Sequence, residues 1–209
     1  DELGGRPFTI SLLDAEADIL MERSKRTRTR LRQSLADKGI GLVLGSEVVS
    51  SDESGVTLAD GRHVAANALV WATGSSAASW LRGTGLALDD AGFVRVDAHL
   101  RSLSHRSLFA AGDIAALPDP RPKAGVFAVR QGPILADNLR RAARGERLKT
   151  YRPQAQWLTL LSTADGRAVA DKWGISLEGR WVFRWKGWND KRFVQRFETL
   201  LAASSAARR

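Results

Sequence analysis

Cysteine is absent from this sequence of 209 residues. Without thiols the chain cannot form disulfides, thiolate metal sites, iron–sulfur clusters or Cys-x-x-Cys redox pairs. The three histidines, His63, His99 and His105, are scattered and lack metal-ligand spacing, so we expect no metal site. No apolar run approaches the ~20 residues that span a bilayer, and the acidic start lacks the apolar region of a signal peptide. We therefore expect a cytoplasmic protein.

The first two thirds of the chain also lack a net positive charge. Up to Leu139 there are 16 basic and 17 acidic residues, whereas from Arg140 onward there are 16 and 6. Five of the seven tryptophans fall between Trp157 and Trp188. The C-terminal third is therefore a different kind of surface from the rest.

The N-terminal part has an α/β pattern. Residues 8–13 predict a short buried strand, residues 21–37 a helix that stops at Gly39, and residues 40–44 a second strand. Strand, helix and strand form the unit of a parallel sheet. Residues 47–50, 56–58 and 62–64 predict a β-meander, and residues 68–72 predict another buried strand that ends at Thr73-Gly74.

The second half begins with loops, and residues 93–96 form a short extended piece. Residues 108–111 predict a core strand, and residues 126–143 a helix that Gly132-Pro133 would kink or split. Further on, the pattern predicts strands at 157–162 and 168–173, then helix over 179–201 with a kink near Gly187. We expect three parts, namely 1–74, 75–150 and 151–209.

Gly112-Asp113 is the first candidate site. It follows a predicted strand, and the carboxyl ends of such strands are where nucleotides bind in open α/β sheets. Glycine allows close approach of a ligand, and the carboxylate can accept hydrogen bonds from ribityl or ribose hydroxyls. An ordinary strand-end turn is the alternative.

The segment from Lys123 to Val126 is the second candidate, because it leads directly into a predicted helix. Free amides at a helix start form an electropositive terminus that suits the anionic side of a reduced flavin. Gly125 and Val126 would lie at that start. An ordinary loop-to-helix junction is the alternative.

Together, LFAAGDIA and PKAGVFAVRQG resemble the C-terminal half of the FAD-dependent pyridine nucleotide-disulfide oxidoreductases. Type II NADH dehydrogenases and sulfide:quinone oxidoreductases are the most similar groups. The stretch LLSTADGRAVADKWGISLEGRWVFRWKGWNDKRFVQRF resembles members that occur alone or fused ahead of selenide, water dikinase. The resemblance implies a partial three-layer FAD/NAD(P)-binding, Rossmann-like α/β fold with a β-meander and a small C-terminal α+β segment.

The resemblance also assigns roles. Residues 1–74 would be the second half of the NAD(P)H domain, and Thr73-Gly74 would lie where the chain crosses back to the FAD domain. Asp113 would contact the ribityl–pyrophosphate region, and Gly125 and Val126 would face the isoalloxazine. The implied reaction passes a hydride from NAD(P)H through FAD to a quinone-like acceptor, with no catalytic acid or base from this chain.

Asp14 is a less direct candidate. An acidic residue that ends the second strand of a dinucleotide fold can bind the ribose 2′-hydroxyl, which would favour NADH over NADPH. A solvated strand end is the alternative, because no Gly-x-Gly-x-x-Gly precedes Asp14.

The sequence departs from the family in two ways. Neither glycine-rich phosphate loop is present, so we expect a fragment that purifies colourless and whose exposed sheet edges favour self-association. The missing thiols disfavour sulfide oxidation.

The basic, tryptophan-rich C-terminus leaves three interpretations open. The aromatic residues could pack in a core, or contact an anionic membrane surface through residues 179–201, or stack on nucleic acid bases, which we favour least. A non-catalytic binding module is therefore the alternative to the enzyme. Membrane contact would place the protein at the inner face of the cytoplasmic membrane.

Overall fold

A computed structural model describes residues 8–206 and the side chains of residues 8–198. The chain forms two compact units. Unit 1 combines the residues up to Leu69 with those from Leu158 onward, and unit 2 consists of Val70–Trp157. The predicted division into 1–74, 75–150 and 151–209 concerns the domains of the whole family fold and stays a prediction.

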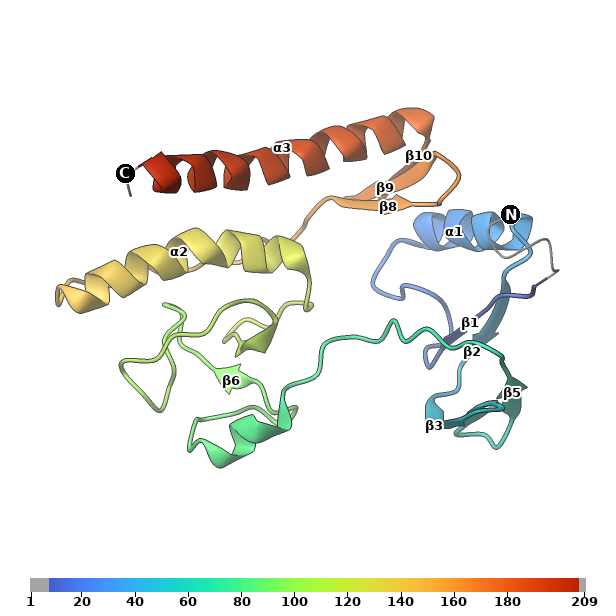
Figure 1. Ribbon diagram of the computed structural model, residues 1–209, viewed down its shortest axis with the longest axis horizontal. Helices are drawn as coiled ribbons and strands as arrows, with labels where there is room; N and C mark the ends of the chain where they lie inside the picture. Colours follow the sequence, from blue (N-terminus) through green and yellow to red (C-terminus); the bar gives the residue numbers. More distant parts are fainter. Residues whose placement is uncertain (1–7, 207–209) are drawn as a thin grey trace. The chain divides into compact units, whose positions relative to one another are not determined.

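Unit 1 begins with the predicted βαβ unit. Strands β1 (Ser11–Asp14) and β2 (Gly41–Leu44) pair in parallel, and helix α1 (Lys25–Asp37) connects them (Figure 1). The expectation that the first strand is buried was wrong, because Phe8, Ile10 and Leu12 are 63%, 46% and 37% exposed. Within the described residues this sheet has two strands, so neither strand has the two flanking neighbours of a central strand.

The predicted β-meander is confirmed. Its three strands are antiparallel and occur in the order β3 (Val48–Asp52), β4 (Gly55–Leu58), β5 (His63–Ala65). Val56 and Leu58 are buried in it. Gly55 has φ +147°, and a Cβ there would lie 2.1 Å from the Val64 carbonyl oxygen, so only glycine fits this tight approach.

The predicted buried strand at residues 68–72 is wrong. Residues 68–78 form neither helix nor strand, and Val70 is 88% exposed. The apolar side chains suit a central strand, but among the described residues no other strand pairs with them.

The C-terminal part of unit 1 is a sheet covered by one helix. Strands β8 (Thr159–Ser162), β9 (Ala168–Lys172) and β10 (Ile175–Gly179) are antiparallel in the order β10-β9-β8, and helix α3 spans Arg180–Ala206. The sequence did not predict β10, and the predicted break near Gly187 is absent from α3. Val182 of α3 packs on Ala168 and Ala170 in a buried cluster.

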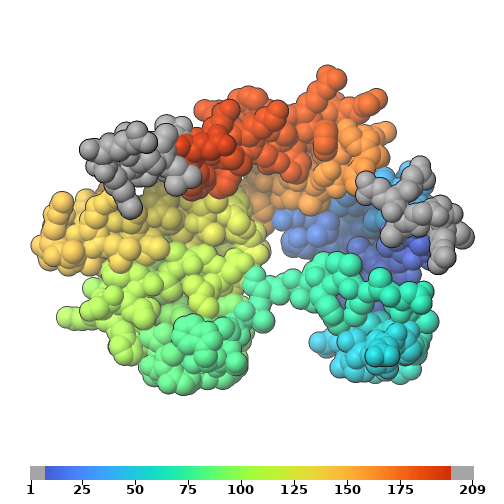
Figure 2. All heavy atoms as spheres, viewed as in Figure 1, coloured from blue at the N-terminus to red at the C-terminus, as the bar shows by residue number. Residues whose placement is uncertain are grey.

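Helix α1 docks on this C-terminal sheet through a buried carboxylate. The Asp171 carboxylate on β9 accepts hydrogen bonds from the hydroxyls of Ser24, at 2.9 Å, and Thr27. Thr27 is fully buried, and Asp171 is 7% exposed. Figure 2 shows the C-terminal residues lying directly against the N-terminal ones. The two ends of the chain therefore form one unit.

Unit 2 is built from short elements around one long helix. They are η1 (Ser79–Gly83), β6 (Val94–Arg95), η2 (Gly112–Ile114), β7 (Ala115–Ala116) and α2 (Gly125–Ala143). Strands β6 and β7 are parallel, and Leu81, Val94, Val96, Ala110 and Ala115 form the core.

Two expectations about unit 2 need correction. The predicted core strand at 108–111 is extended chain with one bridge, from Phe109 to Arg101, because β6 pairs instead with the following residues of β7. Helix α2 continues through Pro133. Its buried residues, Phe127, Gln131 and Asn138, lie on one face, and this packing outweighs the hydrogen bond that Pro133 cannot make.

Candidate functional site

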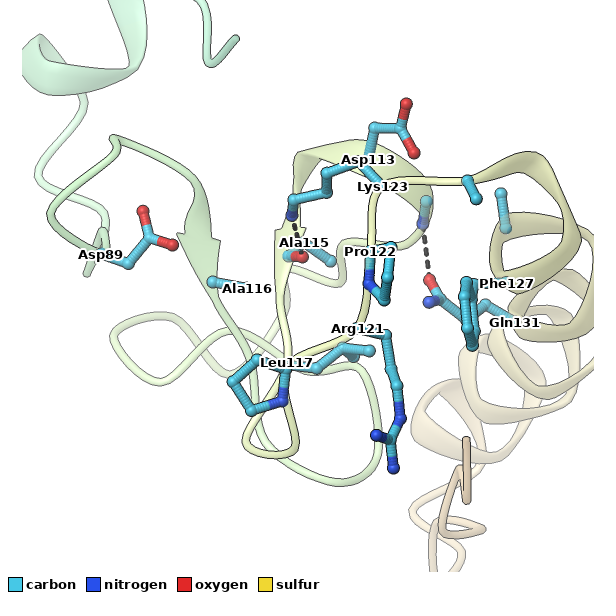
Figure 3. Close-up of a pocket in the computed structure, with 14 residues that line it drawn as sticks. Asp89, Asp113, Ala115, Ala116, Leu117, Arg121, Pro122, Lys123, Phe127 and Gln131 are labelled. Atoms are coloured by element: carbon cyan, nitrogen blue, oxygen red, sulfur yellow. Dashed lines mark hydrogen bonds between the residues drawn. The ribbon is translucent and has the colours of Figure 1, made fainter. Parts of the chain in front are cut away.

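A hollow of unit 2 lies where the segment around Gly112 meets the start of α2 (Figure 3). Its volume is about 130 Å³. It brings together three predicted site residues, Gly112, Asp113 and Lys123. The other lining residues are Asp89, Ala115, Ala116, Leu117, Pro120, Arg121, Pro122, Ala124, Phe127, Ala128 and Gln131.

Gly112 makes the turn that starts η2. Its φ is +74°, a left-handed conformation that glycine adopts without strain, and a Cβ there would lie 3.4 Å from the Ala128 Cβ. The Gly112 N–H donates a 2.6 Å hydrogen bond to Oε1 of Gln131, as Figure 3 shows. The left-handed φ therefore explains the glycine.

Asp113 follows this turn and presents its carboxylate at the pocket. Its Oδ2 accepts a 2.6 Å hydrogen bond from the Ser75 hydroxyl. Ser75 comes directly after Thr73-Gly74, so the predicted crossing element lies next to Asp113. Thr73 and Gly74 themselves are exposed, and neither lines the pocket.

Lys123 is held from two sides. Its Nζ donates a 2.8 Å hydrogen bond to the Ala115 carbonyl and lies 3.9 Å from the centre of the Phe93 ring. Partial burial lowers the pKa of the Lys123 ammonium, and the nearby carboxylates of Asp89 and Asp113 oppose that shift. The ammonium thus adds positive charge to the wall of the pocket beside Ala115.

The start of α2 keeps its amides available. Ala124 is the N-cap and provides no side-chain hydrogen bond, while the Phe127 N–H bonds the Ala124 carbonyl. An N-terminus without a side-chain cap can bind an anion through the N–H groups of Gly125 and Val126. Both residues belong to the first turn of α2, beside the pocket but not in its lining.

Asp14 does not belong to this pocket. It ends β1 in unit 1, where its Oδ1 accepts a 3.0 Å hydrogen bond from the Glu16 N–H. Across the residues that the structure describes, no group of His, Cys, Asp and Glu could hold a metal ion. In the same residues no helix is long and apolar enough to cross a membrane.

Sequence reasoning missed Gln131 and Ser75. Gln131 is 2% exposed on α2, although glutamine is usually exposed. A polar residue on the buried face of a predicted helix, four positions after Phe127, was the available signal. Ser75 carried no such signal, because its contact with Asp113 joins residues 38 positions apart.

The sequence model of the pyridine nucleotide-disulphide oxidoreductases matches residues 6–132, more than half of the chain. The chain belongs to this family. NADH dehydrogenase-like proteins of two Mycobacterium tuberculosis strains are 32% identical over 107 residues, which cover 51% of this chain and 27% of theirs. Ferroptosis suppressor protein 1 of Xenopus tropicalis is 26% identical over 153 residues, which cover 68% of this family member and 40% of that protein.

Solved structures show the fold. The sulfide:quinone oxidoreductase from Aquifex aeolicus superposes with a TM-score of 0.73 at 14% identity, covering 90% of this chain and 49% of that one. The water-forming NADH oxidase from Lactobacillus brevis superposes at 0.59 with 22% identity, covering 78% and 36%. The expected partial, Rossmann-like α/β fold is therefore confirmed. This family member spans about half the length, or less, of the proteins it matches.

Proposed function

We propose that this chain is part of a flavoprotein oxidoreductase that passes a hydride from NAD(P)H through FAD to a quinone-like acceptor. The observation that carries the proposal is the pocket that joins Gly112, Asp113 and Lys123 beside the start of α2. Membership of the pyridine nucleotide-disulphide oxidoreductases supports both cofactors, and the relatives named NADH dehydrogenase-like support NADH as the donor.

FAD fits these residues as one wall of its site. The Asp113 carboxylate already accepts a hydrogen bond from one hydroxyl, that of Ser75, and the ribityl chain offers the same type of donor. The uncapped amides of Gly125 and Val126 suit the anionic side of a reduced flavin, and the Lys123 ammonium adds positive charge to the wall of the same pocket. The volume of about 130 Å³ is well below the ~300–1,000 Å³ of most ligand pockets, so other residues would complete the site.

In this proposal the protein binds and orients, and the cofactor supplies the redox chemistry by accepting a hydride and releasing electrons. Asp113 holds the hydroxyl side of the cofactor, and the start of α2 holds the anionic side of the ring. Asp14 binds the ribose of NADH in unit 1. The relatives named NADH dehydrogenase-like favour NADH as the electron donor, and the likeness to a sulfide:quinone oxidoreductase supports a quinone-like acceptor.

The test is to purify the full-length protein and measure its bound flavin and its oxidation of NADH and NADPH with a soluble quinone. We expect about one flavin per protein and quinone-dependent NADH oxidation. Asp113→Asn should weaken flavin binding about tenfold, because the carboxylate forms a charge-assisted hydrogen bond. Asp90→Asn, the same change at an exposed position outside the pocket, is the matched control. A full-length protein that stays colourless with added FAD contradicts the proposal.

We also propose that α3 contacts a membrane surface that carries anionic lipids. Trp181, Trp185 and Trp188 on this helix are 54%, 36% and 55% exposed, and the rings of Trp181 and Trp185 stack 6.5 Å apart. The helix carries six cations between residues 180 and 198 against two acids, Asp190 and Glu198. Exposed aromatic side chains next to cations suit the interface of an anionic bilayer, and such contact would bring the protein to a lipid-soluble quinone.

Flotation of the full chain with anionic and neutral vesicles tests this contact. We expect binding to anionic vesicles only, weaker in high salt and weaker in the pair Trp181→Ser and Trp188→Ser. Trp80→Ser, at an exposed tryptophan of unit 2, is the control. Failure to float, salt-sensitive retention on DNA, or self-association that buries these tryptophans would each contradict membrane contact.

A further inference from the structure

Gln131 connects the two elements that form the pocket. It lies on α2, whose first turn is one side of the site, and its Oε1 accepts the Gly112 N–H at 2.6 Å. The two residues are 19 positions apart in the sequence. Figure 3 shows this hydrogen bond spanning the space between α2 and the Gly112 turn. The geometry points to Gln131 as a positioning residue for the flavin contact of Asp113, an inference that rests on the proposed function.

The hydrogen bond between Gly112 and Gln131 is buried. The Gln131 side chain is 2% exposed, and a buried polar group without a partner is destabilising. In this left-handed conformation the Gly112 amide has the Gln131 side-chain oxygen as its acceptor. The amide bond to Gln131 therefore stabilises the turn that presents Asp113.

The same bond uses one donor of the turn. The Gly112 N–H is bonded inside the protein, and the Asp113 carboxylate lines the pocket. The anion-binding amides are those at the start of α2. Gln131 thus fixes the distance between an acceptor, Asp113, and a set of donors, Gly125 and Val126, on the same two elements.

Tyr151 is a buried neighbour of Gln131. The Tyr151 side chain is 7% exposed, its burial raises the pKa of the phenol, and the neighbouring Gln131 amide opposes that rise. The Tyr151 N–H donates a 2.8 Å hydrogen bond to the Ala98 carbonyl, which fixes the residue to the loop after β6.

The test compares Gln131→Met, which removes the acceptor, with Gln131→Glu, which keeps an acceptor oxygen. In the chain alone, Gln131→Met should speed hydrogen exchange of the Gly112 amide about tenfold, and Gln131→Glu should restore most of the protection. In the flavin-loaded protein, Gln131→Met should raise the flavin dissociation constant about tenfold and leave the KM for NADH unchanged. Gln33→Met, the same change on exposed α1, should alter neither measurement.

Two outcomes overturn the inference while the proposed function stands. One is a Gly112 amide that exchanges equally fast in Gln131→Met and the unsubstituted protein. The other is a flavin affinity that Gln131→Met leaves unchanged although the Gly112 amide has lost its protection. An unsubstituted full-length protein that binds no flavin overturns both the positioning role and the proposed function.

Discussion

Replacing Asp171 with alanine should separate α1 from the C-terminal sheet. The Asp171 carboxylate accepts hydrogen bonds from the hydroxyls of Ser24 and Thr27, and Thr27 is fully buried. A hydrogen bond to a charged group contributes about 1.5–3 kcal/mol, and a buried hydroxyl without a partner costs a further ~1–3 kcal/mol. We therefore expect Asp171→Ala to lower the free energy of unfolding of unit 1 by about 3–4 kcal/mol. Asp171→Asn keeps one acceptor oxygen and should cost about 1–2 kcal/mol.

Urea unfolding followed by tryptophan fluorescence measures this loss, because Trp173, Trp181, Trp185 and Trp188 all lie in unit 1. Asp190→Ala is the control. Asp190 forms an exposed ion pair with Lys186 one turn away on α3, and such pairs contribute no more than about 0.5 kcal/mol. If Asp171→Ala destabilises the protein no more than Asp190→Ala does, the buried carboxylate does not hold the two ends of the chain together.

Three further predictions test other parts of the structure. The Thr163 hydroxyl, the Lys38 ammonium and the Arg167 amide lower the pKa of Asp165 from 3.8 to about 2, so the stabilisation is complete above pH 3.8 and is lost as pH falls through about 2. Unfolding measured from pH 5 to pH ~2 should show this loss, and Asp165→Asn should remove that part of the pH dependence. Gly112→Ala should lower the stability of unit 2 by about 1–2 kcal/mol in calorimetry, because its φ is +74°, whereas Gly125→Ala, with open space around it, should change stability by less than about 0.5 kcal/mol. Asn138→Ala should cost about 3 kcal/mol in the same measurement, because the buried Asn138 amide bonds the carbonyls of His99 and Lys149 and the Lys149 N–H. An unchanged melting temperature in Asn138→Ala would refute that role.

Local patterns predicted most helices and hairpins. The stop at Gly39 and the β-meander depend on residues that are close together in the sequence, and the structure contains both. The sequence pattern failed to predict the structure where the pairing of strands decides whether a segment forms a strand. Residues 68–72 and 108–111 have the apolar composition of buried strands, but a strand also needs a neighbour, and composition does not report whether one is present.

The candidate site shows the same limit. Gly112 and Lys123 were predictable because backbone conformation and charge next to a helix start are properties of short segments. The partners of Gly112, Asp113 and Lys123 are Gln131, Ser75 and Phe93. They lie 19 to 38 positions away in the sequence, and no local rule connects them. The contact of α1 with Asp171 could not be predicted from the sequence for the same reason.

The bond between Thr27 and Asp171 spans 144 positions of the sequence. During synthesis at about 5–20 residues per second, α1 would wait roughly 7–30 seconds for its partner strand to emerge. Unit 2 consists of Val70–Trp157, so it can form during that interval. Until β9 emerges the Thr27 side chain lacks its buried partner, so the docked state of α1 is reached only after the C-terminal sheet has been made.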